Sequence, residues 1–191
     1  MWYKYISLGR FERFVDIIIN SRIFAAPYFD LNDPMEGLYR YTEGTINQQL
    51  IDKIKGQKEK IRICSLSRTC NSTLMWSHYA NGHKGVAIGV EVKSDHEVRP
   101  VRYKGMSFVQ NATKLGSQET AKDILTYKLD SWFYEEEERV FITSGTFANI
   151  YIREIVLGKR ISKEHKSLVK KLVEQTDASV NVRQAQIENF V

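Results

Sequence analysis

Apolar and polar positions change period several times along the chain, and each change marks an expected element boundary. Alternating or β-branched runs predict strands at 2–6, 23–25, 61–67, 98–103, 150–157 and 178–185. Apolar residues three and four apart predict helices over 11–19, 45–60, 117–131 and from Ser162 onward. The segment 105–116 has no clear period, so we expect a loop there. This irregular alternation favours a single α+β domain over 1–191.

The stretch from Leu74 to Val90 (LMWSHYANGHKGVAIGV) combines a change of period with a cluster of aromatic and histidine side chains. A short helix would place Trp76 and Tyr79 on one face. Asn81-Gly82 should end that helix, since both residues tolerate the left-handed backbone. A half-buried strand then follows Gly85. This arrangement places His83 and Lys84 on a tight loop at the mouth of a sheet, where they can meet a ligand. A helix cap packed onto a sheet is the alternative.

A second unusual stretch, WFYEEEERVFI at 132–142, holds four consecutive glutamates between aromatic and β-branched residues. If a strand begins near Glu135, then Glu135, Glu137 and Arg139 share one face. A glutamate beside aromatic rings would be partly desolvated, so its pKa would rise unless Arg139 or Lys128 compensates. Such a group can stabilise a cationic transition state or accept a proton. Ion pairing of the glutamates with Arg139 and nearby lysines is the alternative.

Composition narrows the class of protein. The chain has 191 residues, 42% hydrophobic residues and a formal net charge of +5, which describes a folded domain with a moderate preference for acidic partners such as nucleotides or nucleic acid. Two cysteines are too few for a disulfide scaffold, and no run of residues could act as a signal peptide or span a bilayer. We therefore expect a cytoplasmic protein with no membrane contact.

The common catalytic and metal-binding motifs are absent from the sequence. Cys64, Cys70, His78 and His83 are zinc-ligand types, but their spacing is not that of a zinc finger, and we expect no metal. The chain has no GxSxG, GxxxxGK[ST] or GxGxxG pattern. The glutamate face is therefore the stronger candidate for chemistry.

The order of several motifs resembles a bacterial and phage-borne family catalogued as domain of unknown function 2971. The resemblance covers nearly the whole chain and is carried by Y-K-Y near the start, N-D-P-M-E at 32–36, C-S-L-S at 64–67, M-W-S-H-Y-A-N-G-H-K-G-V-A-I-G-V at 75–90, Tyr103, Lys128 and W-F-Y-E-E-E-E-R at 132–139. It implies a fold and not a reaction.

A second likeness concerns the ends of the chain. The opening strand, helix and short strand, together with the late glutamate strand, resemble nucleic-acid-modifying ADP-ribosyltransferases, in which NAD lies between the halves of a split, mostly antiparallel sheet flanked by helices. Ser65-Leu66-Ser67 is a loose substitute for the Ser-Thr-Ser motif of such enzymes. Taken with the residue patterns, the likeness implies a catalytic role for Glu137, Glu135 and His83. It implies contact with the cofactor for Tyr3, Tyr5, Arg68, Trp76, Tyr79, Lys84 and Arg139.

We therefore expect an ADP-ribosyltransferase-like enzyme that modifies a protein or nucleic acid with NAD as cofactor, acting as a toxin or in phage defence. One alternative is a non-enzymatic sensor that binds a nucleotide or nucleic acid in the same cleft. Another is a metal-dependent nuclease using Asp33, Glu36 and Glu137. The sequence does not determine the oligomeric state.

Overall fold

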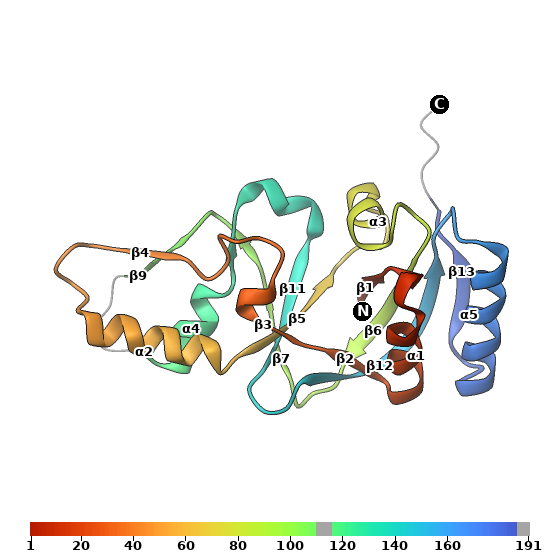
Figure 1. Cartoon of the computed structure of the whole chain (residues 1–191), viewed down its shortest axis with the longest axis horizontal. Coiled ribbons are helices and arrows are strands. Elements are labelled where there is room, and N and C mark those ends of the chain that lie inside the picture. The colour runs from red at the N-terminus through yellow and green to blue at the C-terminus, as the bar shows by residue number, and fades with distance from the viewer. Residues whose placement is uncertain (110–115, 187–191) are drawn as a thin grey trace.

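The computed structural model describes residues 1–109 and 116–186, which fold into one α+β domain with a mostly antiparallel sheet flanked by helices (Figure 1). The strands are β1 (Trp2–Ile6), β2 (Arg22–Phe24), β3 (Ala26–Pro27), β4 (Tyr39–Tyr41), β5 (Arg62–Ser67), β6 (Val86–Val92), β7 (Glu97–Pro100), β8 (Arg102–Tyr103), β9 (Ser107–Val109), β10 (Tyr127–Lys128), β11 (Glu137–Ile142), β12 (Phe147–Leu157) and β13 (Asn181–Gln184). The α-helices are α1 (Phe11–Asn20), α2 (Gln48–Glu59), α3 (Thr73–Tyr79), α4 (Gln118–Ile124) and α5 (Lys163–Thr176). Short 3₁₀ helices are η1 (Leu8–Arg10), η2 (Tyr28–Asp30) and η4 (Asp130–Glu135).

The main sheet has the strand order β13-β12-β6-β1-β5-β11-β7, with β2 added to β12 and β3 added to β5. Its pairings are antiparallel except for the parallel pair β12–β13. Two further pairs, β4–β9 and β8–β10, are parallel and lie outside this sheet. The expected α+β class and mostly antiparallel sheet are thus confirmed.

The sheet is nearly divided between β1 and β5. Strand β1 pairs with β6 over its whole length, from Trp2 to Ile6, and β5 pairs with β11 over all of Arg62–Ser67. In contrast, β1 and β5 share the single register pair Tyr3 and Ser67. Strands β1 and β5 therefore meet at one residue pair and separate beyond it, although β2, which pairs with β12, and β3, which pairs with β5, also connect the two halves.

The main hydrophobic core extends across both halves, since Leu66 of β5 and Val140 of β11 belong to it together with Ile88 of β6. Phe14, Ile17 and Ile18 of α1 and Val169 and Val173 of α5 pack on the half that contains β6 and β12. Helices α2 and α4 pack on each other beside the half that contains β5 and β11, as the left part of Figure 1 shows. The separation of β1 and β5 therefore lies within one continuous domain.

Most predicted elements are confirmed, but several boundaries are wrong. The single strand expected over 98–103 is two strands, β7 and β8, which pair with β11 and β10 respectively. The helix expected over 117–131 ends at Ile124, because the chain then turns to pair β10 with β8 and to bond Arg102 N to Thr126 O. The loop expected over 105–116 contains β9, which pairs with the distant β4; the rest of that segment, 110–115, lies outside the described residues.

The start of the glutamate strand also differs from the prediction. Strand β11 begins at Glu137, since Glu135 ends η4 and Glu136 has a left-handed backbone with φ 44°. The predicted break at Asn81-Gly82 is confirmed, with φ 50° and 60°.

Candidate functional site

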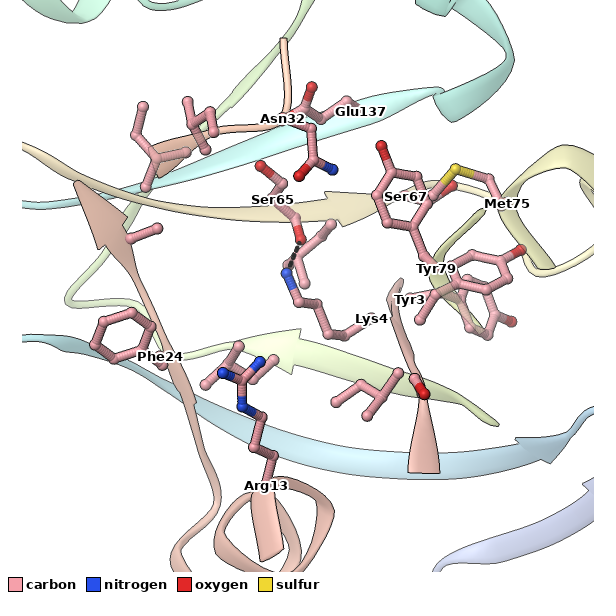
Figure 2. Close-up of a pocket in the computed structure, with 18 of the residues that line it drawn as sticks. Tyr3, Lys4, Arg13, Phe24, Asn32, Ser65, Ser67, Met75, Tyr79 and Glu137 are labelled. Atoms are coloured by element: carbon pink, nitrogen blue, oxygen red, sulfur yellow. Dashed lines mark hydrogen bonds between the residues drawn. The ribbon is translucent and has the colours of Figure 1, made fainter. Parts of the chain in front are cut away.

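A cavity of about 1060 Å³ opens where β1 and β5 separate (Figure 2). One wall comes from β1 and α1, and the opposite wall comes from β5, α3 and the region around Glu135 and Glu137. Small-molecule sites typically have volumes of about 300–1000 Å³, so this cleft has room for an extended ligand.

Three glutamates and two cations form a buried ion cluster at one end of the cleft, made of Glu36, Lys128, Glu135, Glu137 and Arg139. Lys128 Nζ lies 2.6 Å from Glu135 Oε2, 3.1 Å from Glu137 Oε2 and 3.2 Å from Glu36 Oε1. Arg139 Nε donates to Glu137 Oε1 at 2.9 Å, and its guanidinium also binds Glu36 and the carbonyl oxygen of Leu125. Three carboxylates against two cations leave the cluster with a formal charge of −1.

The cations keep Glu137 ionised. Burial alone would raise the pKa of Glu137, but the charges of Arg139 and Lys128 outweigh it and lower the pKa to about 2. Burial would likewise lower the pKa of Lys128, yet the carboxylates of Glu137, Glu36 and Glu135 raise it above its ordinary value. The compensation expected from Arg139 and Lys128 is therefore present, and Glu137 is an anion at neutral pH.

Two tyrosines fix the glutamates from outside the cluster. The hydroxyl of Tyr79, at the end of α3, donates to Glu135 Oε1 at 2.5 Å. The hydroxyl of Tyr103 accepts a hydrogen bond from the backbone N–H of Glu137 at 2.6 Å. Burial raises the pKa of both tyrosines, so both hydroxyls remain protonated at neutral pH.

Five of the residues singled out in the sequence lie on the cleft, namely Tyr3, Tyr5, Tyr79, Glu135 and Glu137. Tyr3 donates from its hydroxyl to Glu154 Oε1 at 2.9 Å, and Tyr5 donates to the carbonyl oxygen of Thr69 at 3.0 Å. Arg139 lies behind this wall with none of its surface exposed, where it holds Glu137. Glu135 and Glu137 converge as expected, although only Glu137 belongs to the strand.

The other four residues are not brought to the cleft lining. Trp76 is fully buried, and its Nε1 donates to the carbonyl oxygen of Cys70 at 2.7 Å. His83 stacks on Trp76 with ring centroids 5.9 Å apart, and its carbonyl oxygen accepts from Arg160 N at 2.9 Å. The loop that carries His83 and Lys84 is thus bonded to the connection between β12 and α5.

Arg68, the fourth of these residues, directly follows β5, and its side chain is about half exposed. Its guanidinium pairs with Glu138, whose side chain points to the face of β11 opposite Glu137. A direct contact between Arg68 and a ligand in the cleft therefore has no support in the geometry.

Sequence reasoning missed two cations on the opposite wall. Lys4 extends from β1 into the cavity and donates to the carbonyl oxygen of Ser65 at 2.9 Å, and Arg13 points into the same space from α1 (Figure 2). No local signal marks either residue. The i, i+3, i+4 pattern of α1 places Arg13 outside the apolar face, but not opposite a strand that comes fifty residues later.

The nuclease alternative requires an open metal site, which Asp33, Glu36 and Glu137 do not form. Glu36 and Glu137 come together, but Lys128 and Arg139 fill the space between their carboxylates. Asp33 accepts through Oδ1 from the backbone N–H of Met35 at 2.9 Å. Within the described ranges, no group of three or more His, Cys, Asp or Glu side chains is arranged to hold a metal ion.

Comparison with protein-family models, curated proteins and solved structures gives no match for this chain. The site is therefore interpreted from its own geometry. Among the helices of the described residues, none has the length and apolar character needed to cross a membrane.

Proposed function

We propose that the protein is an ADP-ribosyltransferase-like enzyme that transfers ADP-ribose from NAD to a macromolecule. The observation that carries the proposal is the pair Glu135 and Glu137, held by cations on the wall of a cleft that opens where the two halves of the sheet separate. Its setting in toxicity or phage defence follows from the family resemblance alone.

The chemistry requires an anion beside the ribose. The bond between the ribose C1′ and the nicotinamide nitrogen breaks, its electron pair leaves with nicotinamide, and the ring loses its positive charge. An oxocarbenium-like centre remains on the ribose, and a fixed carboxylate stabilises it because the charge needs no solvent reorganisation. Glu137, whose pKa is lowered to about 2, supplies that carboxylate. The acceptor atom then bonds to C1′ and gives its proton to a base, the role that we assign to Glu135.

The acceptor is a nucleic acid or a protein. The net charge of +5 favours a polyanionic partner over an acidic small molecule alone. Adding RNA, DNA or protein separately to the reaction tests this point, since the true acceptor accelerates nicotinamide release and becomes labelled.

The decisive test is nicotinamide release from NAD by wild type, Glu137→Gln and Glu135→Gln. We expect Glu137→Gln to reduce turnover by about 10²–10³-fold, the usual cost of removing one preorganised electrostatic group. Glu138→Gln is the matched control, since the same change is made one residue away on the opposite face. Circular dichroism and melting temperature establish that each variant is folded.

A wild-type protein that releases no nicotinamide with any acceptor, or a Glu137→Gln variant as active as Glu138→Gln, contradicts the proposal. Glu135→Gln provides a second, milder probe. Glu135 bonds to Lys128 and Tyr79 but not to the buried Arg139, so its substitution leaves the pairing of Arg139 with Glu137 in place.

One observation favours a second candidate, a non-enzymatic nucleotide-binding sensor. Both carboxylate oxygens of Glu137 are already bonded to cations, Oε1 to Arg139 and Oε2 to Lys128 and Arg139. In that case, the cluster would be a fixed wall, the cleft would bind a nucleotide, and NAD would remain intact. Binding of NAD that persists in Glu137→Gln, with no release by wild type, selects this candidate.

A further inference from the structure

The wall of the cleft opposite the glutamates is positively charged. Lys4 of β1 and Arg13 of α1 both point into the cavity, as Figure 2 shows, and Arg10 also lines it. Lys4 uses one of its three ammonium donors on the carbonyl oxygen of Ser65, which leaves two for another acceptor. The cleft therefore has an acidic end and a basic end.

Arg13 differs from most other arginines of the fold in its bonding. Arg22, Arg99, Arg102 and Arg153 each pair with a carboxylate. Across residues 1–109 and 116–186, Arg13 has neither a hydrogen-bond acceptor nor an ion-pair partner. A guanidinium directed into a cavity without an acceptor is available to an anionic ligand.

The neighbouring acids do not neutralise this cation. Asp16, one turn along α1, accepts from Asn20 at 2.7 Å and forms an ion pair with Arg22 at 2.8 Å. Glu12 also lines the cavity but forms no ion pair with Arg13. The charge of Arg13 therefore remains available to the cleft.

We propose that Arg13 and Lys4 form a phosphate-binding subsite that takes the pyrophosphate of a nucleotide. The guanidinium fork can donate two parallel hydrogen bonds to phosphate oxygens, and the ammonium adds a point charge beside it. This assignment rests on the proposed function for the other end of the ligand, where the nicotinamide ribose would lie against Glu135 and Glu137.

The order of charges along the cleft also favours one redox form of the nicotinamide cofactor. Oxidised NAD carries phosphates in its centre and a positive ring at one end, which complements a basic wall followed by a cluster of formal charge −1. The reduced form lacks the ring charge. The cleft should therefore bind oxidised NAD more tightly than NADH.

The test is calorimetric binding of ADP-ribose, which has the pyrophosphate but no nicotinamide and cannot be cleaved at that bond. We expect Arg13→Gln to weaken binding by about 10- to 100-fold, as for the loss of a charge-assisted hydrogen bond, and Lys4→Gln to weaken it in the same direction. Arg153→Gln makes the same charge change at an exposed position on β12 outside the cleft lining and should leave binding unchanged.

Arg13 is exposed and lies outside the apolar face of α1, so its substitution should leave the fold intact. No binding of ADP-ribose by wild type at millimolar concentration, or equal affinities for Arg13→Gln and Arg153→Gln, overturns the subsite.

The subsite and the transferase can fail separately. Arg13-dependent binding of ADP-ribose without any nicotinamide release would keep the subsite and remove the transferase. Glu137-dependent release with an unchanged KM for NAD in Arg13→Gln would keep the transferase and remove the subsite.

Discussion

Arg139 shows how much of the site depends on one enclosed side chain. It is fully buried, and its guanidinium binds Glu36, Glu137 and the carbonyl oxygen of Leu125. Its removal would leave buried carboxylates with too few cations. We expect Arg139→Met to lower the free energy of unfolding by about 3–5 kcal/mol, measured by urea denaturation.

The matched control for this change is Arg153→Met. Arg153 pairs with Glu91 on the exposed surface, where such pairs contribute little. If the two variants lost equal stability, the cluster would not be the buried network described above.

The lowered pKa of Glu137 predicts how the stability of the folded protein depends on pH. Its pKa in the folded protein is about 2, against an ordinary value of 4.5, so the folded state is stabilised by ionised Glu137 above about pH 4.5. That contribution is lost as the pH falls from 4.5 to 2. Glu36 acts in the opposite direction, because burial raises its pKa and its ionisation opposes folding as the pH rises.

Melting temperatures of wild type and Glu137→Gln between pH 7 and pH 2 test the prediction. The advantage of wild type should be constant near neutrality and should shrink below about pH 4.5. An advantage that persists unchanged at pH 2 would mean that Glu137 is not held ionised by its neighbours.

At the scale of the elements, the turn from α3 into β6 has no room for a side chain at Gly85. A Cβ there would lie 2.1 Å from the carbonyl oxygen of Ile6 in β1, which is backbone and cannot move aside freely. We expect Gly85→Ala to cost about 1–3 kcal/mol of stability. Gly56, inside α2, has nothing within 4 Å of the same position, so Gly56→Ala should stabilise by up to about 1 kcal/mol.

Chemical denaturation of the two alanine variants measures this contrast. The predicted signs are opposite, so a common shift in both variants would point to a general effect of alanine on the unfolded chain instead.

Sequence periodicity was sufficient for elements that bury one face. Helices α1 and α5 and strands β1, β5 and β6 follow the expected patterns because each packs an apolar side on the main core. The pattern failed where a distant partner decides the conformation. Strands β9 and β10 exist through pairing with β4 and β8, and neither short segment carries a signal of its own.

The residues of the candidate site were likewise predictable only where a local pattern marks them. Glu135 and Glu137 were evident because four glutamates among aromatics are unusual, whereas Arg13 and Lys4 become relevant only when β5 is folded opposite them. His83 and Lys84 were expected at the ligand. Their loop instead bonds to the β12–α5 connection, a contact between segments more than seventy residues apart that no local pattern shows.

At the scale of the whole molecule, the weak join between β1 and β5 predicts uneven protection from hydrogen exchange. Backbone amides that bond β1 to β6 and β5 to β11 belong to continuous ladders, whereas the facing edges of β1 and β5 share one residue pair. We expect the amides on the facing edges to exchange faster in the free protein. Exchange measured by NMR with and without ADP-ribose tests this, and uniform protection across both edges would contradict it.

The narrow join also has a practical consequence for identifying the natural ligand. Any compound that bonds to Arg13 on one side of the cleft and to the glutamate wall on the other links the two parts of the sheet where their strands join weakly, so its binding should raise the melting temperature of the protein. At a concentration one hundred times its Kd, such a compound adds about 2.7 kcal/mol to the unfolding free energy. A thermal-shift screen of nucleotides could therefore rank candidate substrates before any activity is known.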